Sequence, residues 1–336
     1  MRVAVIGGGA WGTALAAHAA RHDHDVRIWA REPAVVRDVN EKHENLLFLE
    51  GVRLPASLRA ESDVARALEG AAMVLLVPPS AHLRTVAASV APHVPPGAPV
   101  VIATKGIETG SRKLMIDVAH DVMPKAHIAV LSGPSFAREV ASGLPTDVVA
   151  AARDEAIATR VAECLHAPTF RVYTSTDTIG VELGGALKNV LAIAAGACDG
   201  LGMGTNARAS LVTRGLAEMA RLGVALGGQP LTFMGLSGVG DLILTATGPL
   251  SRNRALGMKV AEGVDPARYV ASQRTVAEGY LTAKAAWELA QEKGVDVPIT
   301  EQVYRVLHEG RTLFDAMKHL LTRAQKHELW GFRVTT

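Results

Sequence analysis

The chain has 336 residues, of which 49% are hydrophobic and 20% are charged. This length suggests two domains, and this composition is typical of a globular protein with a large buried core rather than of a disordered chain. Because 35 Lys and Arg residues stand against 33 Asp and Glu residues, the formal net charge is only +2, and we expect no nucleic-acid partner bound through an extended basic surface.

Short β-branched runs alternate with helix-period segments in the first part of the chain. The runs that predict strands are residues 3–6, 25–29, 73–77, 100–103, 128–131 and 148–151. The segments that predict helices are residues 11–21, 33–42, 63–68, 82–91 and 112–123. Such alternation predicts an α/β domain of the Rossmann type, with a doubly wound, mostly parallel sheet and helices on both faces.

The pattern changes after about Thr176, where strand-like runs become rare. Long Ala- and Leu-rich segments of helical period follow, at residues 179–197, 207–226, 276–292 and 300–309. They predict an all-helical C-terminal domain. We therefore place a dinucleotide-binding domain at residues 1–178 and a helical substrate and catalytic domain at residues 179–336.

The cysteines and the apolar runs indicate the cellular compartment in which the protein works. Cys164 and Cys198 are too few for a disulfide framework or a four-thiolate metal site, so we expect two buried thiols in a reducing compartment. The apolar run at residues 3–6 is too short for a signal peptide, and no run approaches the roughly 20 apolar residues of a membrane-spanning helix. We expect a cytoplasmic protein without stable membrane insertion.

A glycine-rich turn follows the first predicted strand. Residues 7–12 read GGGAWG, directly after a strand and directly before a helix. Gly7 suits a sharp turn, Gly9 lets a pyrophosphate approach the backbone, and Gly12 lets the helix pack on the strand. The alternative is a flexible turn, but the surrounding strands and helix favour dinucleotide binding.

The next predicted strand ends just before Arg31 and Glu32. An acidic residue at this point usually holds the ribose hydroxyls of NAD, whereas an arginine suits the 2′-phosphate of NADP. Arg31 therefore favours NADP(H), and Glu32 leaves NAD(H) open. A simpler alternative is that Arg31 only solvates the end of a strand.

Polar residues follow two further strands. Lys105 comes after one of them, and a turn with Gly133 and Ser135 comes after the other. Because ligands of open α/β sheets bind beyond the carboxyl ends of the strands, these residues predict a cationic, hydrogen-bonding edge. The alternative for Lys105 is a solvated charge in a loop.

Lys188 lies on a long apolar helix among small residues. Gly184 and Gly185 come one turn before it and Ala192 one turn after, which lets another body approach the ammonium closely. A buried lysine near a carboxylate is able to donate a proton to a carbonyl oxygen as hydride arrives. The alternative is a lysine that extends to solvent from a tight helix contact.

A second polar cluster lies around residue 250. Ser251 predicts the N-cap of a short helix to about Leu256, with Arg252 and Arg254 in a first turn that disfavours cations. A bound anion, held by Arg252 and the Asn253 amide, explains this placement, and a surface helix with unfavourable arginines is the alternative. Asp241 either orients Lys188, binds a hydroxyl or caps a helix.

The 12 histidines do not complete a metal site. His18, His22 and His24 span the end of a predicted helix, without Cys or acidic partners at ligand spacing. We expect no metal.

Six segments, in order, resemble the bacterial NAD(P)-dependent glycerol-3-phosphate dehydrogenase family: GGGAWGTALA, ATKGIE, LSGPSFAREV, GVELGGALKNVLAIAAG, GVGDLILTATGPLSRNRALG and VAEG. The resemblance covers nearly the whole chain. It implies reversible reduction of dihydroxyacetone phosphate to sn-glycerol 3-phosphate for phospholipid synthesis, with NADP(H) or NAD(H) as cofactor. It also implies a helical second domain and a homodimer.

The resemblance assigns roles to individual residues. Lys188 is the implied catalytic proton donor and acceptor, and Asp241 is its implied catalytic partner. The implied substrate-binding residues are Lys105, Gly133, Ser135, Lys188, Asp241, Thr245, Ser251, Arg252 and Asn253. The cofactor-binding residues, including the glycines of the turn, are Gly7, Gly9, Ala10, Trp11, Gly12, Arg31, Lys105, Ala137, Arg252, Val276 and Glu278.

Two positions depart from the family pattern. Relatives often have Ser where this chain has Ala10, and many have Cys where it has Ala246. Neither change removes a charge that the reaction needs. Two other functions remain open on the residues. One is a β-hydroxyacid dehydrogenase with the same architecture, and the other is a non-catalytic NAD(P)-sensing protein.

Overall fold

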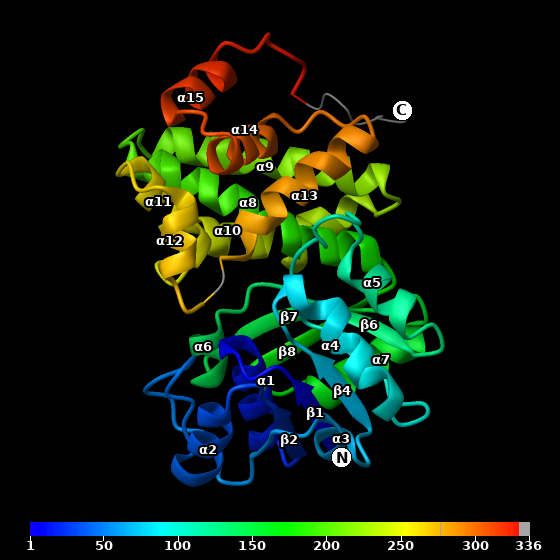
Figure 1. Cartoon of the computed structure of the whole chain (residues 1–336). Coiled ribbons are helices and arrows are strands. Elements are labelled where there is room, and N and C mark those ends of the chain that lie inside the picture. The colour runs from blue at the N-terminus through cyan, green and yellow to red at the C-terminus, as the bar shows by residue number, and fades with distance from the viewer. Residues whose placement is uncertain (276, 329–336) are drawn as a thin grey trace. The chain divides into compact units, whose positions relative to one another are not determined.

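The computed structural model describes residues 1–275 and 277–328 (Figure 1). The chain forms two compact units. The sheet unit contains Met1–Glu108 and Lys113–Glu182, and the helical unit contains Thr109–Arg112 and Leu183–Thr336. The division falls inside helix α8 (Thr178–Gly200), whose start coincides with the domain boundary predicted at residues 178 and 179. That boundary stays a prediction.

The sheet unit is built on eight strands in the order β3-β2-β1-β4-β5-β6-β7-β8. Neighbouring strands run parallel except β6 and β7, which are antiparallel. The strands are β1 (Arg2–Ile6), β2 (Asp25–Trp29), β3 (Arg59–Glu61), β4 (Met73–Leu76), β5 (Val100–Ile102), β6 (Ile128–Ser132), β7 (Thr146–Ala151) and β8 (Phe170–Ser175).

Helices cover both faces of this sheet. Every residue of Val3–Ile6, of β4 and of β5 is buried, as expected for central strands that are covered on both sides. Helix α1 packs on α6, and α4 packs on α5. The helices are α1 (Ala10–Arg21), α2 (Pro33–Lys42), α3 (Val64–Leu68), α4 (Leu83–Val90), α5 (Met115–Val122), α6 (Ala137–Ala141) and α7 (Glu155–Leu165). The predicted fold class is confirmed for this part of the chain.

The helical unit contains no strand in the part that the structure describes. Its helices are the greater part of α8, then α9 (Thr205–Ala225), α10 (Asp241–Thr247), α11 (Arg252–Ala261), α12 (Pro266–Ser272), α13 (Glu278–Glu292), α14 (Pro298–His308) and α15 (Leu313–Leu321). A 3₁₀ turn, η3 (Pro230–Met234), and a π turn, η4 (Leu236–Gly240), precede α10. The predicted all-helical character is confirmed.

Helix α8 is long and apolar enough, by length and composition alone, to cross a membrane. However, 94% of its most apolar stretch is buried by the rest of the protein, which is typical of a core helix. Glycines bring its neighbour α11 into backbone contact. A Cβ on Gly196 would lie 2.0 Å from the carbonyl oxygen of Arg254, and a Cβ on Gly257 would lie 2.0 Å from that of Ile193.

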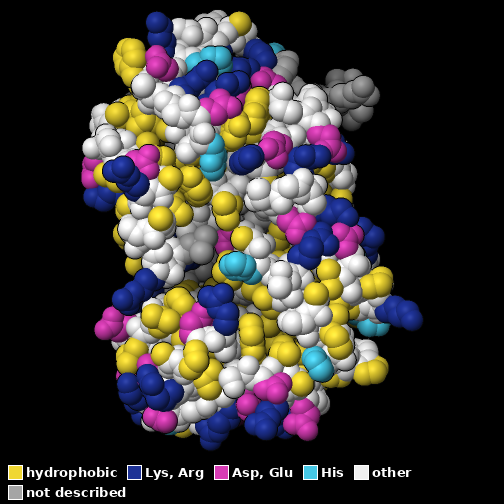
Figure 2. Space-filling view, viewed as in Figure 1, with side chains coloured by type: hydrophobic (Ala, Val, Ile, Leu, Met, Phe, Trp, Pro, Cys, Tyr) yellow, Lys and Arg dark blue, Asp and Glu magenta, His cyan; other side chains and the backbone are white. Residues whose placement is uncertain are grey.

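Figure 2 shows basic and acidic side chains intermingled with apolar ones on the face in view. Both cysteines are free and buried, as predicted. Burial raises the pKa of the Cys164 thiol to about 11, so the thiol stays protonated.

Candidate functional site

The glycine-rich turn has the geometry that close phosphate approach requires. Gly7 has a φ of +130°, and a Cβ there would lie 2.7 Å from the carbonyl oxygen of Val77. A Cβ on Gly12 would lie 1.9 Å from the carbonyl oxygen of Gly7, so α1 begins in contact with the end of β1. A Cβ on Gly9 would meet nothing within 4 Å, which leaves this side of the turn open to a ligand.

The N-terminus of α1 offers donors to an anion. Its N-cap, Gly9, has no side-chain capping hydrogen bond, and no acidic residue lies in the first turn. Unpaired backbone N–H groups and the helix dipole favour a phosphate here. Ala10 opens the helix, and Trp11 follows with Nε1 buried and without a hydrogen-bond partner among the described residues. These features fit the pyrophosphate and the adjacent parts of a dinucleotide.

Arg31 and Glu32 are paired at the end of β2. The Glu32 carboxylate accepts hydrogen bonds from Arg31 Nε at 3.1 Å and from Nη2 at 2.9 Å. The Arg31 side chain is 74% exposed, so the pair is weak and an incoming group is able to displace it. Arg31 favours NADP(H) and Glu32 leaves NAD(H) open, so the pairing of these two residues bears directly on the choice of cofactor.

Lys105, Gly133 and Ser135 lie together beyond the carboxyl ends of β5 and β6. Lys105 Nζ donates to the Gly133 carbonyl oxygen at 2.9 Å and to Ser135 Oγ at 3.5 Å, so it is not simply a solvated loop charge. Ser135 Oγ donates to the same carbonyl at 2.9 Å. Gly133 has a φ of +140°, and a Cβ there would lie 2.9 Å from the Cα of Val148, so only glycine fits. Ala137 begins α6 nearby.

The helical unit contains a buried ion pair between Lys188 and Asp241. Lys188 is 8% exposed and Asp241 is fully buried, and Lys188 Nζ donates to Asp241 Oδ1. Thr245 Oγ1 donates to the Asp241 carbonyl oxygen at 2.7 Å. The alternative of an exposed lysine at the edge of a helix contact is wrong, because its ammonium is held inside the protein.

Backbone packing brings this pair together. A Cβ on Gly184 would lie 2.3 Å from the carbonyl oxygen of Ser237, so the π turn η4 rests directly on α8. The turn ends at Gly240, and Asp241 is the first residue of α10. The N-cap of α10 is Gly240, so the interpretation of Asp241 as a capping residue is wrong, and its carboxylate is directed to Lys188 instead. Single π turns are frequent at functional sites.

A second buried network surrounds Asn253. Its Nδ2 donates to Asn189 Oδ1 at 2.9 Å, and its Oδ1 accepts from the Gly279 N–H at 3.0 Å. These contacts fix which end of the amide is the donor, and the contact to Asn189 uses only one of the two Nδ2 hydrogens. Sequence reasoning missed Asn189. The signal was its position next to Lys188, but only the packing of α11 on α8 shows its partner.

The arginines of α11 differ in their surroundings. Ser251 caps the helix as predicted, because its Oγ accepts from the Arg254 N–H at 3.2 Å, but α11 continues past Leu256 to Ala261. Arg254 Nε and Nη2 bind Asp199 Oδ2 at 2.9 and 2.7 Å, so its place in the first turn has a structural cause.

Arg252 is exposed and makes no hydrogen bond or ion pair among the described residues. Crowding by the surrounding protein lowers the pKa of its guanidinium, and the carboxylate of Glu278, at the start of α13, acts in the opposite direction. An arginine stays charged under these conditions. The anion-binding hypothesis therefore rests on Arg252.

The predicted residues form two sets. The sheet unit holds Gly7, Gly9, Ala10, Trp11, Gly12, Arg31, Lys105, Gly133, Ser135 and Ala137. The helical unit holds Lys188, Asp241, Thr245, Ser251, Arg252, Asn253 and Glu278. Val276, which the resemblance assigns to the cofactor, lies outside the described residues.

His18 of α1 and His24, which lies between α1 and β2, have structural roles. His18 Nε2 makes a hydrogen bond of 2.7 Å with the Leu165 carbonyl oxygen, and His24 Nε2 makes one of 2.8 Å with that of Cys164. Burial lowers the pKa of His18 to about 4, so the ring is neutral. The described residues contain no group of three or more His, Cys, Asp or Glu side chains that would hold a metal ion.

The sheet unit has a Rossmann-type sheet with a glycine-rich turn, and the helical unit has a buried lysine–aspartate pair. These two features are typical of a two-domain dehydrogenase that uses a nicotinamide dinucleotide. The family model for the NAD-dependent glycerol-3-phosphate dehydrogenase N-terminus matches residues 2–158, and the model for the C-terminus matches residues 177–318. The chain belongs to this family and is an NAD(P)-dependent enzyme.

Individual relatives agree. The glycerol-3-phosphate dehydrogenase [NAD(P)+] of Nitratidesulfovibrio vulgaris is 52% identical over 330 residues, which cover 98% of this chain and 100% of the relative. That of Myxococcus xanthus is 48% identical over 334 residues, with 98% and 100% covered. The crystal structure of the glycerol-3-phosphate dehydrogenase of Coxiella burnetii is 40% identical, has a TM-score of 0.92 and covers 96% of this chain and 99% of its own.

Proposed function

We propose that the chain interconverts dihydroxyacetone phosphate and sn-glycerol 3-phosphate with NAD(P)H, and that Lys188 is its proton donor and acceptor. The observation that carries this proposal is the buried pair of Lys188 with Asp241. Two relatives that are 52% and 48% identical to this chain are named glycerol-3-phosphate dehydrogenase, which supports this choice of substrate. A β-hydroxyacid dehydrogenase or a sensing protein leaves the family match unexplained.

The chemistry requires a hydride and a proton. Bound NAD(P)H supplies the hydride to the carbonyl carbon of the substrate. The Lys188 ammonium donates its proton to the carbonyl oxygen, which becomes the hydroxyl of the product, and the neutral amine is then reprotonated from solvent. The Asp241 carboxylate holds the ammonium in place, and the ammonium also stabilises the negative charge that develops on oxygen.

The start of α11 holds the substrate phosphate in this proposal. The Ser251 hydroxyl hydrogen, the Arg252 guanidinium and the second Nδ2 hydrogen of Asn253 are donors to its oxygens. Lys105 and Ser135 are further substrate-binding residues that we propose from the family resemblance alone. Holding the phosphate orients the carbonyl group for reaction, so binding energy lowers the barrier.

In this proposal the sheet unit holds the pyrophosphate of the dinucleotide. The open side of Gly9 and the N-terminus of α1 receive the pyrophosphate, and Trp11 Nε1 gains an acceptor. The further cofactor contacts that we propose from the family resemblance are Arg31, Lys105, Ala137, Arg252, Val276 and Glu278.

A direct assay tests the reaction. We expect the reduced-nicotinamide absorbance to fall when dihydroxyacetone phosphate is added to the enzyme with NADPH or NADH, and to stay constant with a β-keto carboxylate. Inorganic phosphate should compete with the substrate. Oxidation of the cofactor by the carboxylate alone would instead establish a β-hydroxyacid dehydrogenase.

Replacing Glu32 by glutamine is expected to shift cofactor preference toward NADPH. The change frees Arg31 from its carboxylate and removes a negative charge near the 2′-phosphate. Because an exposed ion pair contributes up to about 1 kcal/mol, the ratio of kcat/KM for NADPH to that for NADH should rise about fivefold. Steady-state kinetics with both cofactors measure it.

Asp25→Asn is the matched control, since Asp25 pairs with Arg2 in an exposed ion pair elsewhere on the sheet unit. It should leave the ratio unchanged. Arg31→Ala should shift the preference the other way. An unchanged ratio in both Arg31→Ala and Glu32→Gln would remove this pair from cofactor selection.

Asn189→Ala is expected to raise the KM for dihydroxyacetone phosphate while kcat changes little. The variant removes the acceptor that fixes the Asn253 amide, so its donor is no longer held toward the phosphate. A buried hydrogen bond contributes about 1 kcal/mol, which corresponds to about a fivefold rise in KM. Asn189→Asp keeps the acceptor and should restore the KM. A lower stability with an unchanged KM would show that Asn189 has a packing role and does not position the Asn253 amide.

We also propose that the enzyme works as a homodimer in the cytoplasm and that its product feeds glycerophospholipid synthesis. The family resemblance supports the dimer and the pathway, and the two buried free thiols fit a reducing compartment. Sedimentation equilibrium of the purified chain tests the dimer.

A further inference from the structure

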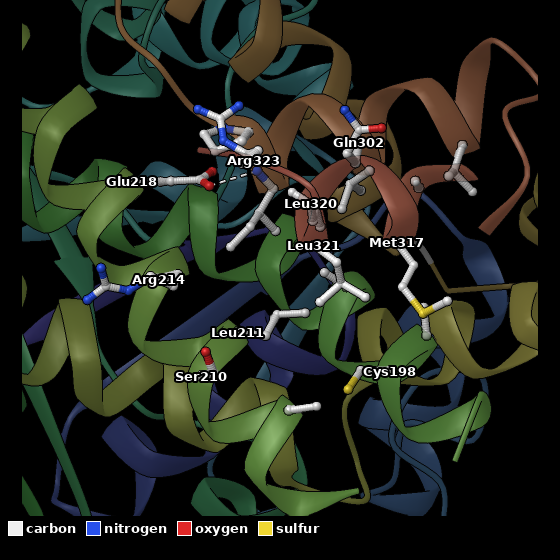
Figure 3. Close-up of a pocket in the computed structure, with 18 of the residues that line it drawn as sticks. Cys198, Ser210, Leu211, Arg214, Glu218, Gln302, Met317, Leu320, Leu321 and Arg323 are labelled. Atoms are coloured by element: carbon white, nitrogen blue, oxygen red, sulfur yellow. Dashed lines mark hydrogen bonds between the residues drawn. The ribbon is translucent and has the colours of Figure 1, made fainter. Parts of the chain in front are cut away.

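The helical unit contains a cavity of about 470 Å³ that neither Lys188 nor residues 251–253 line (Figure 3). We call it the α9 groove. It follows one face of α9, defined by Ala207, Leu211, Arg214, Ala217, Glu218 and Arg221. Helices α8, α11, α14 and α15 and the segment after α15 form its other walls. Its volume is in the range of small-molecule sites.

The groove is long. Ala207 and Arg221 are separated by about four turns of α9, which correspond to about 21 Å. A groove of this length is able to take an extended hydrocarbon chain.

The walls are mainly hydrophobic. Figure 3 shows Leu211 of α9 opposite Leu320 and Leu321 of α15, with Met317 further along α15. Leu321 is 71% exposed although it lines the groove, so its apolar surface stays in contact with water. A hydrocarbon chain in the groove would remove this surface from water, which is favourable.

Positive charge gathers at one end. The carboxylate of Asp296 accepts from Arg323 Nη2 at 2.6 Å and Lys326 Nζ at 3.0 Å, and its carbonyl oxygen accepts from Arg221 Nη2 at 3.1 Å. Two cations thus share the Asp296 carboxylate, and a third binds the carbonyl oxygen of the same residue.

Two further acids line the groove, namely Glu328, whose carboxylate lies 3.7 Å from Arg214 Nη2, and Glu218. Burial raises the pKa of Glu218 to about 7, so part of it is neutral at physiological pH. Its carboxylate already accepts from the N–H groups of Ile299 and Thr300, at 2.7 and 3.1 Å. It therefore does not balance the surplus of positive charge, which favours an anionic group at this end.

A buried donor also lacks a partner. Gln302 lines the groove and is 3% exposed, one turn of α14 after Ile299. Its Oε1 accepts from Arg311 Nη1 at 2.7 Å, whereas its Nε2 has no hydrogen-bond partner among the described residues. A buried amide N–H without an acceptor is unfavourable, so a ligand oxygen beside it would be stabilising.

We propose that the α9 groove binds an unbranched long-chain carboxylate. The hydrocarbon chain lies along Leu211, Leu320 and Leu321. The carboxylate lies at the end lined by Arg323 and Gln302. This site is separate from the proposed dehydrogenase site and does not rest on it.

Calorimetric titration of the whole chain with octanoate, decanoate and dodecanoate, each below its micelle concentration, tests the proposal. We expect one saturable site per chain, with affinity that rises about fourfold for each added methylene. Methyl dodecanoate, which lacks the charge, should bind about tenfold more weakly. Binding that does not saturate, or affinity independent of chain length, would overturn the proposal.

Two matched variants locate the site. Ala217→Phe fills the groove and should weaken dodecanoate binding at least tenfold, whereas Ala209→Phe, on an exposed face of α9 outside the groove, should leave it unchanged. Equal binding by the two variants would place the ligand elsewhere. If sedimentation shows that Ala217→Phe separates copies of the chain, the groove is an interface and the proposal is wrong.

Arg323→Ala provides a test that does not depend on the folding of Ala217→Phe. It should weaken binding of dodecanoate while binding of methyl dodecanoate stays the same. A parallel loss for both ligands would show that the head group does not lie at Arg323. Turnover of dihydroxyacetone phosphate should be retained in Arg323→Ala and Ala209→Phe.

Discussion

Replacing Lys188 by alanine is expected to lower kcat for dihydroxyacetone phosphate about a thousandfold while the dissociation constant of NAD(P)H stays the same. General acid catalysis by a positioned side chain contributes about 10²–10⁴ in rate. The loss should be large because the ammonium also stabilises charge on the carbonyl oxygen. Cofactor binding should persist, since the glycine-rich turn and Arg31 belong to the sheet unit. Stopped-flow turnover and fluorescence titration of NADPH measure the two quantities.

The structure requires a stability control for this variant. Lys188→Ala leaves the fully buried Asp241 carboxylate without its ammonium, which costs about 3–5 kcal/mol if the carboxylate stays charged. The double variant Lys188→Met with Asp241→Asn removes both charges and should be more stable but equally inactive. Lys259→Ala, a surface lysine paired with Glu262, should leave both turnover and stability near the original values. Substantial turnover in Lys188→Ala would mean that another group supplies the proton.

Replacing Arg252 by alanine is expected to raise the KM for dihydroxyacetone phosphate about a hundredfold, with a smaller decrease in kcat. Arg252 is the exposed cation at the start of α11, and a charge-assisted bond to a phosphate contributes about 1.5–3 kcal/mol. The decrease in kcat follows if the phosphate contact also orients the carbonyl group. Unphosphorylated dihydroxyacetone should be reduced equally poorly by both forms of the enzyme.

Arg254→Ala is the informative control for Arg252→Ala. Arg254 lies two residues away on the same helix, but its guanidinium is bound to Asp199, which also accepts from Arg208 at 2.9 Å. This variant should lower the melting temperature and leave the substrate KM nearly unchanged. If instead Arg252→Ala leaves the KM unchanged, the phosphate is held by other residues.

The sheet unit was largely predictable, because its strands are short buried runs separated by amphipathic helices. The prediction omitted β3 and β8, and it omitted α6 and α7. β3 has only three residues, and β8, at an edge of the sheet, has Phe170 as its one buried residue, so neither forms a continuous apolar run. The antiparallel pairing of β7 with β6 depends on long-range contacts that no local pattern contains.

The sequence by itself determined the features that depend on neighbouring residues. The turn at residues 7–12 needs glycine at positions where the backbone has positive φ or where a Cβ would clash, and Ser251 caps the helix that follows it. Such constraints act over a few residues, so their residue types are visible in the chain itself.

Only the tertiary structure decided which polar groups meet. Asp241 lies 53 residues from Lys188, and it reaches the ammonium because the backbone of η4 packs on the small surface of Gly184. The same packing of helices pairs Asn253 with Asn189 and Arg254 with Asp199, whereas Arg252 stays exposed. These outcomes depend on distances across the fold, and residue type alone fixes charge and hydrogen-bonding capacity but not the partner.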